Sequence, residues 1–259
     1  MKNKKLQKAL KISAGVLFWI LLWQFSAMAF GKPLIFPTPI ATAAKLLELM
    51  RTSAFYTTVL KSLLRIFEGF LVGVAAGTLI GAVNGFDYKL SGVAEAFTVP
   101  VIAVLRATPV ASVIILMFYF LSRQNIPAFT SALIVTPIVS EAVKKGLKET
   151  DVQLREVAEV FGFGFWKKLL RLYIPSAAPY FYTACRSSVG LAWKSGVAAE
   201  VICNLPGSIG NMLYNAKITL EAEDLFAWTA ATVILSVLLE KVLVSLLDAA
   251  VGREKCRLK

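Results

Sequence analysis

Six long apolar stretches constrain the fold of this chain more than any other feature of its sequence. Each is close to the length that a helix needs to cross a lipid bilayer, about 20 residues at about 1.5 Å per residue. They cover about 12–30, 63–86, 97–121, 126–143, 172–202 and 225–247. No repeat, flexible linker or low-complexity tract divides them. We therefore expect an all-α integral membrane protein with about six transmembrane helices, folded as a single domain over residues 1–259.

The first apolar stretch follows a basic segment, MKNKKLQKALK, which is also the arrangement at the start of a secretory signal peptide. The stretch from 12 to 30 is free of charge and of spanning length, and no convincing small-residue cleavage pattern precedes Gly31. We expect it to be retained as a membrane helix.

The composition excludes several classes of function. Hydrophobic residues make up 57% of the chain and charged residues only 17%, so no soluble domain is left to present a basic face to nucleic acid. There is no histidine, and the three cysteines are neither paired in sequence nor arranged as CxxC. We expect no nucleic-acid partner, no disulfide framework and no metal site. The cysteines are Cys185, Cys203 and Cys256.

The formal charge of +12 is explained by membrane topology. Lysine and arginine gather in the short segments that lie inside if the N-terminus is cytoplasmic, as the positive-inside rule requires. Both termini are then cytoplasmic, and the connection at about 144–171 is the longest cytoplasmic loop. The cations that fall inside are Lys2, Lys4, Lys5, Lys8, Lys11, Lys144, Lys145, Lys148, Arg155, Lys167, Lys168, Arg171, Arg253, Lys255, Arg257 and Lys259.

Between the first two stretches, Thr38 and Pro39 form a typical helix start, an N-cap followed by proline at the first helical position. Apolar residues then recur at helical spacing from Ile40 to Met50, opposite charged ones. This pattern predicts a short amphipathic helix on the outer surface. We favour a cap packed over the bundle over contact with a partner.

The cytoplasmic loop contains a helix signal of its own. Thr150 to Gln153 has the form of a capping box, apolar residues follow at helical spacing from Leu154 to Phe161, and Gly162 is a natural stop. The apolar face is too small to span a membrane, so it must dock on protein or lie on lipid headgroups. Spacing alone leaves both open.

The same loop resembles the EAA loop of ABC importer permeases. Glu156-Val157-Ala158 is followed by Gly162 and, thirteen residues later, by Ile174-Pro175. Valine stands at 157 where that family usually has alanine. The resemblance implies a type I ABC importer permease bundle whose coupling helix sits in a groove of a separate cytoplasmic ATPase. The residues that it assigns to coupling are Glu156, Ala158, Glu159, Phe161, Gly162 and Pro175.

Two further segments narrow the resemblance to permeases of the nitrate, sulfonate, taurine and bicarbonate group. They are Ser62-Leu63-Leu64-Arg65 with the glycines that follow, and Gly190-Leu191-Ala192-Trp193 with Val197-Ala198-Ala199-Glu200. The resemblance implies a bacterial cytoplasmic membrane, a permease homodimer, an extracytoplasmic substrate-binding protein, and a small anionic or polar organic solute such as a sulfonate, nitrate or taurine.

A phosphate-cradling motif of the form GxxxxGK[ST] is absent from the sequence. We therefore expect this chain to be no enzyme, to have no catalytic residue and to hold no cofactor of its own. Under the permease interpretation, ATP and Mg bind to the partner ATPase.

Charged groups inside a membrane span are costly, at about 2.5–3.5 kcal/mol each on insertion scales, and usually face protein or a water-filled path. We hypothesise that Arg106 and Lys194 make such a path electropositive. Structural ion pairs or snorkelling to the interface explain them equally well. We expect the pair Arg65 and Glu68, three residues apart, to be a local ion pair. The complete set of path candidates is Arg106, Pro109, Arg186, Trp193, Lys194 and Glu200.

The glycines of the second stretch recur every four residues, at 69, 73, 77 and 81. This spacing predicts a face that packs closely against another helix of the bundle.

Two other functions are kept as alternatives. In an ion-coupled secondary transporter the charges within the spans would form the coupling site, but inverted halves and paired broken helices are not evident. In a non-transporting membrane scaffold neither the loop nor the charges would act in transport.

Overall fold

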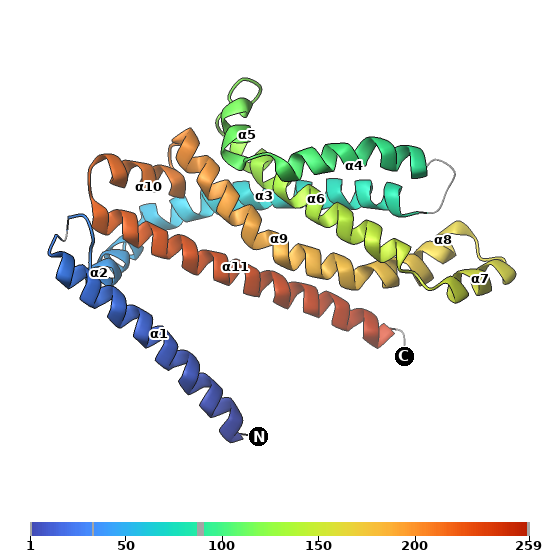
Figure 1. Ribbon diagram of the computed structural model, residues 1–259, viewed down its shortest axis with the longest axis horizontal. Coiled ribbons are helices and arrows are strands. Elements are labelled where there is room, and N and C mark those ends of the chain that lie inside the picture. Colours follow the sequence, from blue (N-terminus) through green and yellow to red (C-terminus); the bar gives the residue numbers. More distant parts are fainter. Residues whose placement is uncertain (1, 33, 87–90, 258–259) are drawn as a thin grey trace.

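The computed structural model describes the chain except for residues 1, 33, 87–90 and 258–259, and every regular element in the described part is helical. Figure 1 shows an elongated bundle with short helices at both ends. The elements are α1 (Lys2–Phe30), α2 (Pro39–Met50), α3 (Ser53–Gly85), α4 (Ser91–Ala107), α5 (Val110–Met117), α6 (Ile126–Lys148), α7 (Val152–Val160), α8 (Phe165–Lys168), the π-helical turn η1 (Leu169–Tyr173), α9 (Ile174–Cys203), α10 (Ile209–Ile218) and α11 (Ala222–Arg257).

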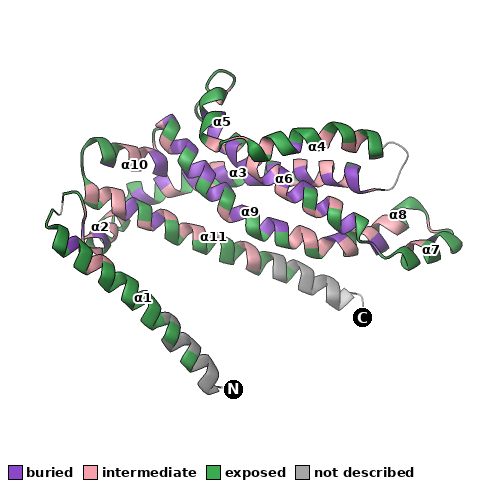
Figure 2. Cartoon of the chain, in the orientation of Figure 1, coloured by how far each residue is buried: buried purple, intermediate pink, exposed green. Residues whose placement is uncertain are grey.

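The core of the bundle is the packing of α3 and α9 on either side of α6. Figure 2 shows that the buried residues concentrate on these three helices, whereas α1 is largely exposed. Small residues let α3 approach α6 closely: a Cβ atom added at Gly77 would lie 2.6 Å from the Thr136 carbonyl oxygen, and one added at Gly81 would lie 2.5 Å from that of Ser140. The predicted close-packing face is confirmed, and α6 is the helix that it contacts.

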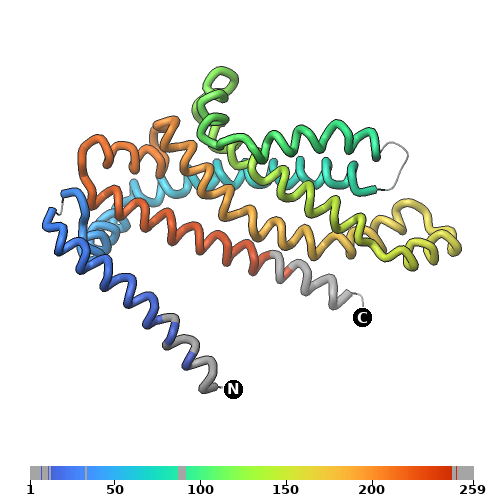
Figure 3. Tube along the Cα trace, viewed as in Figure 1, coloured from blue at the N-terminus to red at the C-terminus, as the bar shows by residue number. Residues whose placement is uncertain are grey.

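The bundle has two distinct ends. In Figure 3 the chain passes through α2 and α10 at one end and through α7 and α8 at the other, and the described part of α11 runs toward the α7 end. The long helices α3, α6 and α9 run between these ends and form the core that both ends share.

The predicted amphipathic helix is present as α2. The Thr38 hydroxyl accepts a hydrogen bond from the Ala41 amide at 3.2 Å, which caps the helix as expected. Lys45 forms ion pairs with Asp224 of α11, at 3.6 Å, and with Glu48. Burial acts to lower the pKa of Lys45, but these two carboxylates outweigh it and raise the pKa above its ordinary value. The helix therefore caps the bundle by packing on α11.

The stretch expected to form one span at 97–121 is instead broken. Its helices α4 and α5 are bent by 102° at Thr108-Pro109, so the prediction of a continuous helix was wrong. Pro109 has no amide hydrogen to continue the α4 ladder, and it stands at the N-cap of α5 with an extended backbone. Polar contacts tie α4 to its neighbours, Asn84 to Thr98 at 2.7 Å and Lys144 to Glu95 at 2.5 Å.

The stretch at 172–202 forms a helix, but it is not apolar enough to count as a span by composition. Among the described residues, four helices are long and apolar enough to cross a membrane: α1, α3, α6 and α11. The number is five if the bent pair α4–α5 forms one further span. The expected number was about six. α9 falls short because serine, proline and charged residues lower its hydropathy. Ser188, Ser195 and Glu200 are buried among the neighbouring helices, whereas Arg186 and Lys194 are exposed.

The seam between α3 and α6 gives a prediction about stability. Gly77→Ala should destabilise the protein by about 1–3 kcal/mol, because the new methyl group overlaps the α6 backbone. Gly15→Ala is the matched control, since no heavy atom lies within 4 Å of its added Cβ. Thermal denaturation, monitored by size-exclusion chromatography, should show a melting temperature below that of the wild type for Gly77→Ala only. Equal melting temperatures for Gly77→Ala and the wild type would contradict this packing.

Candidate functional site

The helix of the long loop begins one residue later than its sequence suggested. Asp151, not Thr150, is the N-cap of α7, and its carboxylate accepts a hydrogen bond from the Gln153 amide at 2.8 Å. The Thr150 side chain is 2% exposed and its hydroxyl has no partner among the described residues. The predicted N-cap was therefore wrong by one position, because aspartate is as favourable at an N-cap as threonine.

The exit from α7 is a tightly bonded turn. Gly162 has a φ of +61°, its amide donates to the Glu159 carbonyl at 2.9 Å, and the Phe163 amide donates to the Ala158 carbonyl at 2.8 Å. These two bonds are those of a Schellman motif, which needs a residue in the left-handed region at the position of Gly162. The glycine ends the helix as the sequence predicted.

The apolar face of α7 is mostly uncovered. Ala158 is buried at 4% exposure, but Val157 is 49% exposed, Val160 85% and Phe161 73%. Glu156 is also exposed, while Glu159 pairs with Lys168 at 3.4 Å. The helix therefore rests on the bundle through its small residue and presents apolar side chains and a carboxylate outward, at one extremity of the molecule (Figure 1).

Pro175 follows a widened turn of helix. The chain is helical without interruption from α8 through η1 into α9, and the π-helical turn lies directly before the proline. Because proline has no amide hydrogen, it cannot bond to the carbonyl four residues earlier, and a wider turn accommodates the gap. Pro175 is thus part of the rod that connects the loop to the core.

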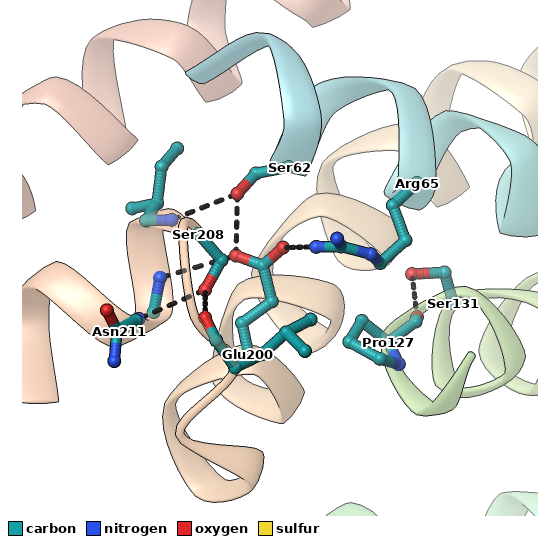
Figure 4. A network of polar contacts seen from close by, with 10 residues as sticks. Ser62, Arg65, Pro127, Ser131, Glu200, Ser208 and Asn211 are labelled. Carbon is teal, nitrogen blue, oxygen red and sulfur yellow. Dashed lines mark hydrogen bonds and ion pairs between the residues drawn. The ribbon is translucent and has the colours of Figure 1, made fainter. Parts of the chain in front are cut away.

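A buried polar network lies near the opposite end of α9. The Glu200 carboxylate is fully buried and accepts hydrogen bonds from the Ser62 hydroxyl and the Arg65 guanidinium, both at 2.8 Å, and from the Gly210 amide at 3.3 Å. Figure 4 shows Ser62 and Arg65 reaching the carboxylate from α3. A buried charge of this kind is tolerated only when it is paired and hydrogen-bonded.

The same network holds the turn between α9 and α10. The Ile209 amide donates to the Ser62 hydroxyl at 3.0 Å, and Ser208 caps α10 by accepting from the Asn211 amide at 3.1 Å. A Cβ atom at Gly210 would meet the Cβ atom of Glu200 at 2.4 Å, so the start of α10 packs directly against this residue. Three helices, α3, α9 and α10, are therefore joined at one carboxylate.

This arrangement corrects one prediction. Arg65 was expected to pair with Glu68, three residues along the same helix, but its ion pair is with Glu200 of α9. A buried carboxylate 135 positions away has greater need of a cation than an exposed one, because it cannot be solvated by water.

The residues suggested for a path occupy different environments. Arg106 forms an ion pair with Glu141 at 2.6 Å, and Arg186 forms one with Glu240 at 3.6 Å. The Trp193 indole is buried and donates to the Thr232 carbonyl at 3.0 Å. Pro109 stands at the bend between α4 and α5, Lys194 is exposed on α9, and Glu200 is enclosed in its network.

A cavity of about 550 Å³ lies between α6 and α9 and is bordered by Arg106 of α4. Lys145, Thr183 and Ser187 also line it. Thr183, Ser187 and Lys194 are all exposed, and their spacing of four and seven residues places them on one face of α9. Polar side chains thus continue along α9 beyond the cavity to Lys194.

The sequence matches a known family from the middle of α3 into α11. A family model described as "Binding-protein-dependent transport system inner membrane component" matches residues 69–254. The chain belongs to this family. It is accordingly a multi-pass membrane protein and a permease of an ABC importer that works with a binding protein.

Curated relatives place it among permeases of similar length. The bicarbonate transport system permease protein CmpB of Synechococcus elongatus is 26% identical over 83% of this chain and 79% of its own length. The nitrate import permease protein NrtB of the same species is 27% identical over 83% and 79%. The putative aliphatic sulfonates transport permease protein SsuC of Bacillus subtilis is 26% identical over 80% and 74%. The permease is therefore of the nitrate, sulfonate and bicarbonate type.

Solved structures show the same fold. A chain of a bacterial alginate ABC transporter, in complex with an alginate-bound periplasmic protein, superimposes with a TM-score of 0.61 at 16% identity and covers 96% of each chain. A chain of an amino acid ABC transporter gives 0.60 at 18% identity, covering 80% of this permease and 97% of that chain. The expected type I importer permease fold is confirmed.

The partner of Glu200 was the main residue that sequence reasoning missed. Both Arg65 and Glu200 were noticed as charges near or inside spans, yet their spacing gives no sign that α3 and α9 meet there. The available signal was Ser62, a polar residue one turn before Arg65, which puts two donors on one face of α3.

The buried pair predicts an asymmetric effect of mutation. Arg65→Met should destabilise the permease by about 3–5 kcal/mol because it leaves Glu200 charged and enclosed. Glu200→Gln should lower the free energy of unfolding by less, because the Arg65 side chain is 19% exposed and can still reach water. The double variant should melt above Arg65→Met alone, and a double variant that is the least stable of the three would contradict the pairing.

Proposed function

We propose that this permease forms the substrate path of an ATP-driven importer for a small anionic or polar organic solute, and that α7 couples it to a separate ABC ATPase. ATP-driven closure of two ATPases would move α7 in each of two permease copies. The paired bundles would then rock from inward-facing to outward-facing, so that a loaded external binding protein releases its ligand into the path.

The observation that carries the proposal is the exposed face of α7. Val157, Val160 and Phe161 present apolar surface to the outside, and the Schellman turn at Gly162 fixes the angle at which the helix stands. Apolar surface gathered at the tip of a helix favours a protein partner. The exposed Glu156 can pair with a basic residue of that partner.

The orientation follows from the distribution of basic residues. Lys144, Lys145, Lys148, Lys167 and Lys168 cluster around α7, which supports a cytoplasmic position for this end of the bundle and for both termini. The α2 and α10 end then faces the external binding protein.

The polar face of α9 supports a path shared by two copies. Thr183, Ser187 and Lys194 are exposed on a membrane helix, where facing lipid would be costly. A second permease copy set against this face would enclose a water-filled path and extend the cavity beside Arg106. The names of the bicarbonate, nitrate and sulfonate relatives favour an anion as the solute.

Coupling can be tested at the exit of α7. Gly162→Asp should leave the permease in the membrane but abolish its association with the ATPase and its uptake activity, because φ is +61° there. Gly164→Ala is the matched control, with a φ of −62° and open space around its Cβ. Co-purification of the ATPase with each variant measures the effect, and Glu156→Arg should behave like Gly162→Asp. Normal transport in both variants would refute the assignment.

The path can be tested separately. Lys194→Met should reduce uptake of an anionic solute more than tenfold if the charge faces the path, whereas Arg186→Met, which removes the ion pair with Glu240, should reduce it less. Arg106→Met should act like Lys194→Met. Initial uptake rates in membrane vesicles measure this, and unchanged apparent affinity and rate in the Lys194 and Arg106 variants would exclude both from the path. Uptake that persists without any ATPase would favour an ion-coupled transporter instead.

A further inference from the structure

A second cavity, of about 590 Å³, is lined by Arg65 but not by Glu200. It is formed by α3, the segment after α5 and the start of α6, in the half of the bundle remote from α7. Its polar lining consists of Lys61, Arg65, Glu68, Gln124 and Asn125, and Leu64, Val72 and Phe129 contribute to its apolar walls. None of these polar residues was suggested for the path by the sequence.

Arg65 belongs both to the buried network of Glu200 and to the lining of this cavity. One of its terminal nitrogens donates to the Glu200 carboxylate at 2.8 Å, and the residue lines the cavity. A guanidinium has five N–H donors in a rigid planar fork, so fixing one edge on a buried carboxylate leaves the others at a defined orientation. Glu200 has no exposed surface of its own and acts on the cavity only through Arg65.

Unlike Arg65, the other donors that line the cavity have no side-chain partner among the described residues. Within the described part of the chain, the side-chain amides of Gln124 and Asn125 make no hydrogen bond and Lys61 has no ion pair; Asn125 stands at the N-cap of α6 without capping it. Donors from two segments, α3 and the connection between α5 and α6, therefore line one space. Glu68 is the acidic residue of the lining, and it opposes the attraction of an anion.

From this geometry we propose that the cavity binds an oxyanion, with Arg65 and Lys61 contacting its charged oxygens, the two amides completing the contacts and Glu200 acting as the positioning residue for Arg65. Planar and tetrahedral oxyanions both present oxygens that match the guanidinium fork. The same chemistry is found in a small solute anion and in the phosphate of a lipid headgroup. The inference deepens the proposed function, because a solute anion held here would be on the binding-protein side of the path.

The test is direct binding to the purified full-length permease in dodecyl maltoside, without ATPase or binding protein. Radiolabelled methanesulfonate is the probe, and nitrate and sulfate are competitors. Wild type should bind it saturably. Arg65→Lys keeps the charge beside Glu200 but loses the fork, and Lys61→Met removes an exposed charge; each should weaken binding about tenfold. Glu68→Gln should tighten it, and the control Lys217→Met, an exposed cation of α10, should leave it unchanged.

Two measurements separate positioning from folding. Glu200→Gln should weaken the affinity while leaving the number of sites per protein unchanged, whereas a merely structural role would reduce the number of sites. Gln124→Ala changes an exposed residue outside the core, so it keeps a folded protein and should still weaken binding.

The source of the oxyanion is decided by adding short-chain phosphatidylglycerol. Displacement of methanesulfonate by nitrate or sulfate identifies a solute site, and displacement by the lipid at far lower concentration identifies a headgroup site. The proposal is overturned if the wild-type permease does not bind methanesulfonate saturably. It is also overturned if Arg65→Lys and Lys61→Met bind methanesulfonate with the affinity of the wild type. Gly162→Asp should bind normally, so loss of coupling and loss of this site are distinguishable.

Discussion

The close approach of α3 and α6 is the contact on which the rest of the bundle depends. Glycine at every fourth position removes the side chains that would hold the two backbones apart, and van der Waals packing between the helices then replaces contact with lipid. Since lipid tails are as apolar as the helices, such packing matters more in a membrane than in water. The seam fixes α3, and α3 carries Ser62 and Arg65 to the carboxylate of α9.

Local patterns were sufficient to predict most of the elements. Apolar length located the long helices, Thr38 located the start of α2, and Gly162 located the end of α7, because each signal is contained in a few neighbouring residues. The glycine repeat predicted a close contact but could not name α6 as its partner. Spacing within one helix defines a face, and it does not say which other helix covers that face.

The failures have a common physical cause, which is competition between nearby alternatives or contact between distant segments. Asp151 and Thr150 can both cap α7, and local spacing does not separate them. Arg65 can pair with Glu68 or Glu200, and only the packed bundle shows that the latter is enclosed. Pro109 was considered only as a path residue, and it was not used to predict the 102° bend between α4 and α5.

The uninterrupted helix from Phe165 through η1 to Cys203 connects the two ends of the permease in one element. At about 1.5 Å per residue it is a rod roughly 55–60 Å long, nearly twice the thickness of the hydrocarbon core. Its ends are joined to α7 on one side and, through Glu200, to α3 and α10 on the other. Under the proposed coupling, such a rod would work as a lever: a small tilt imposed at the loop would become a displacement of several ångströms at the far end, without any step in which a signal passes from one side chain to the next.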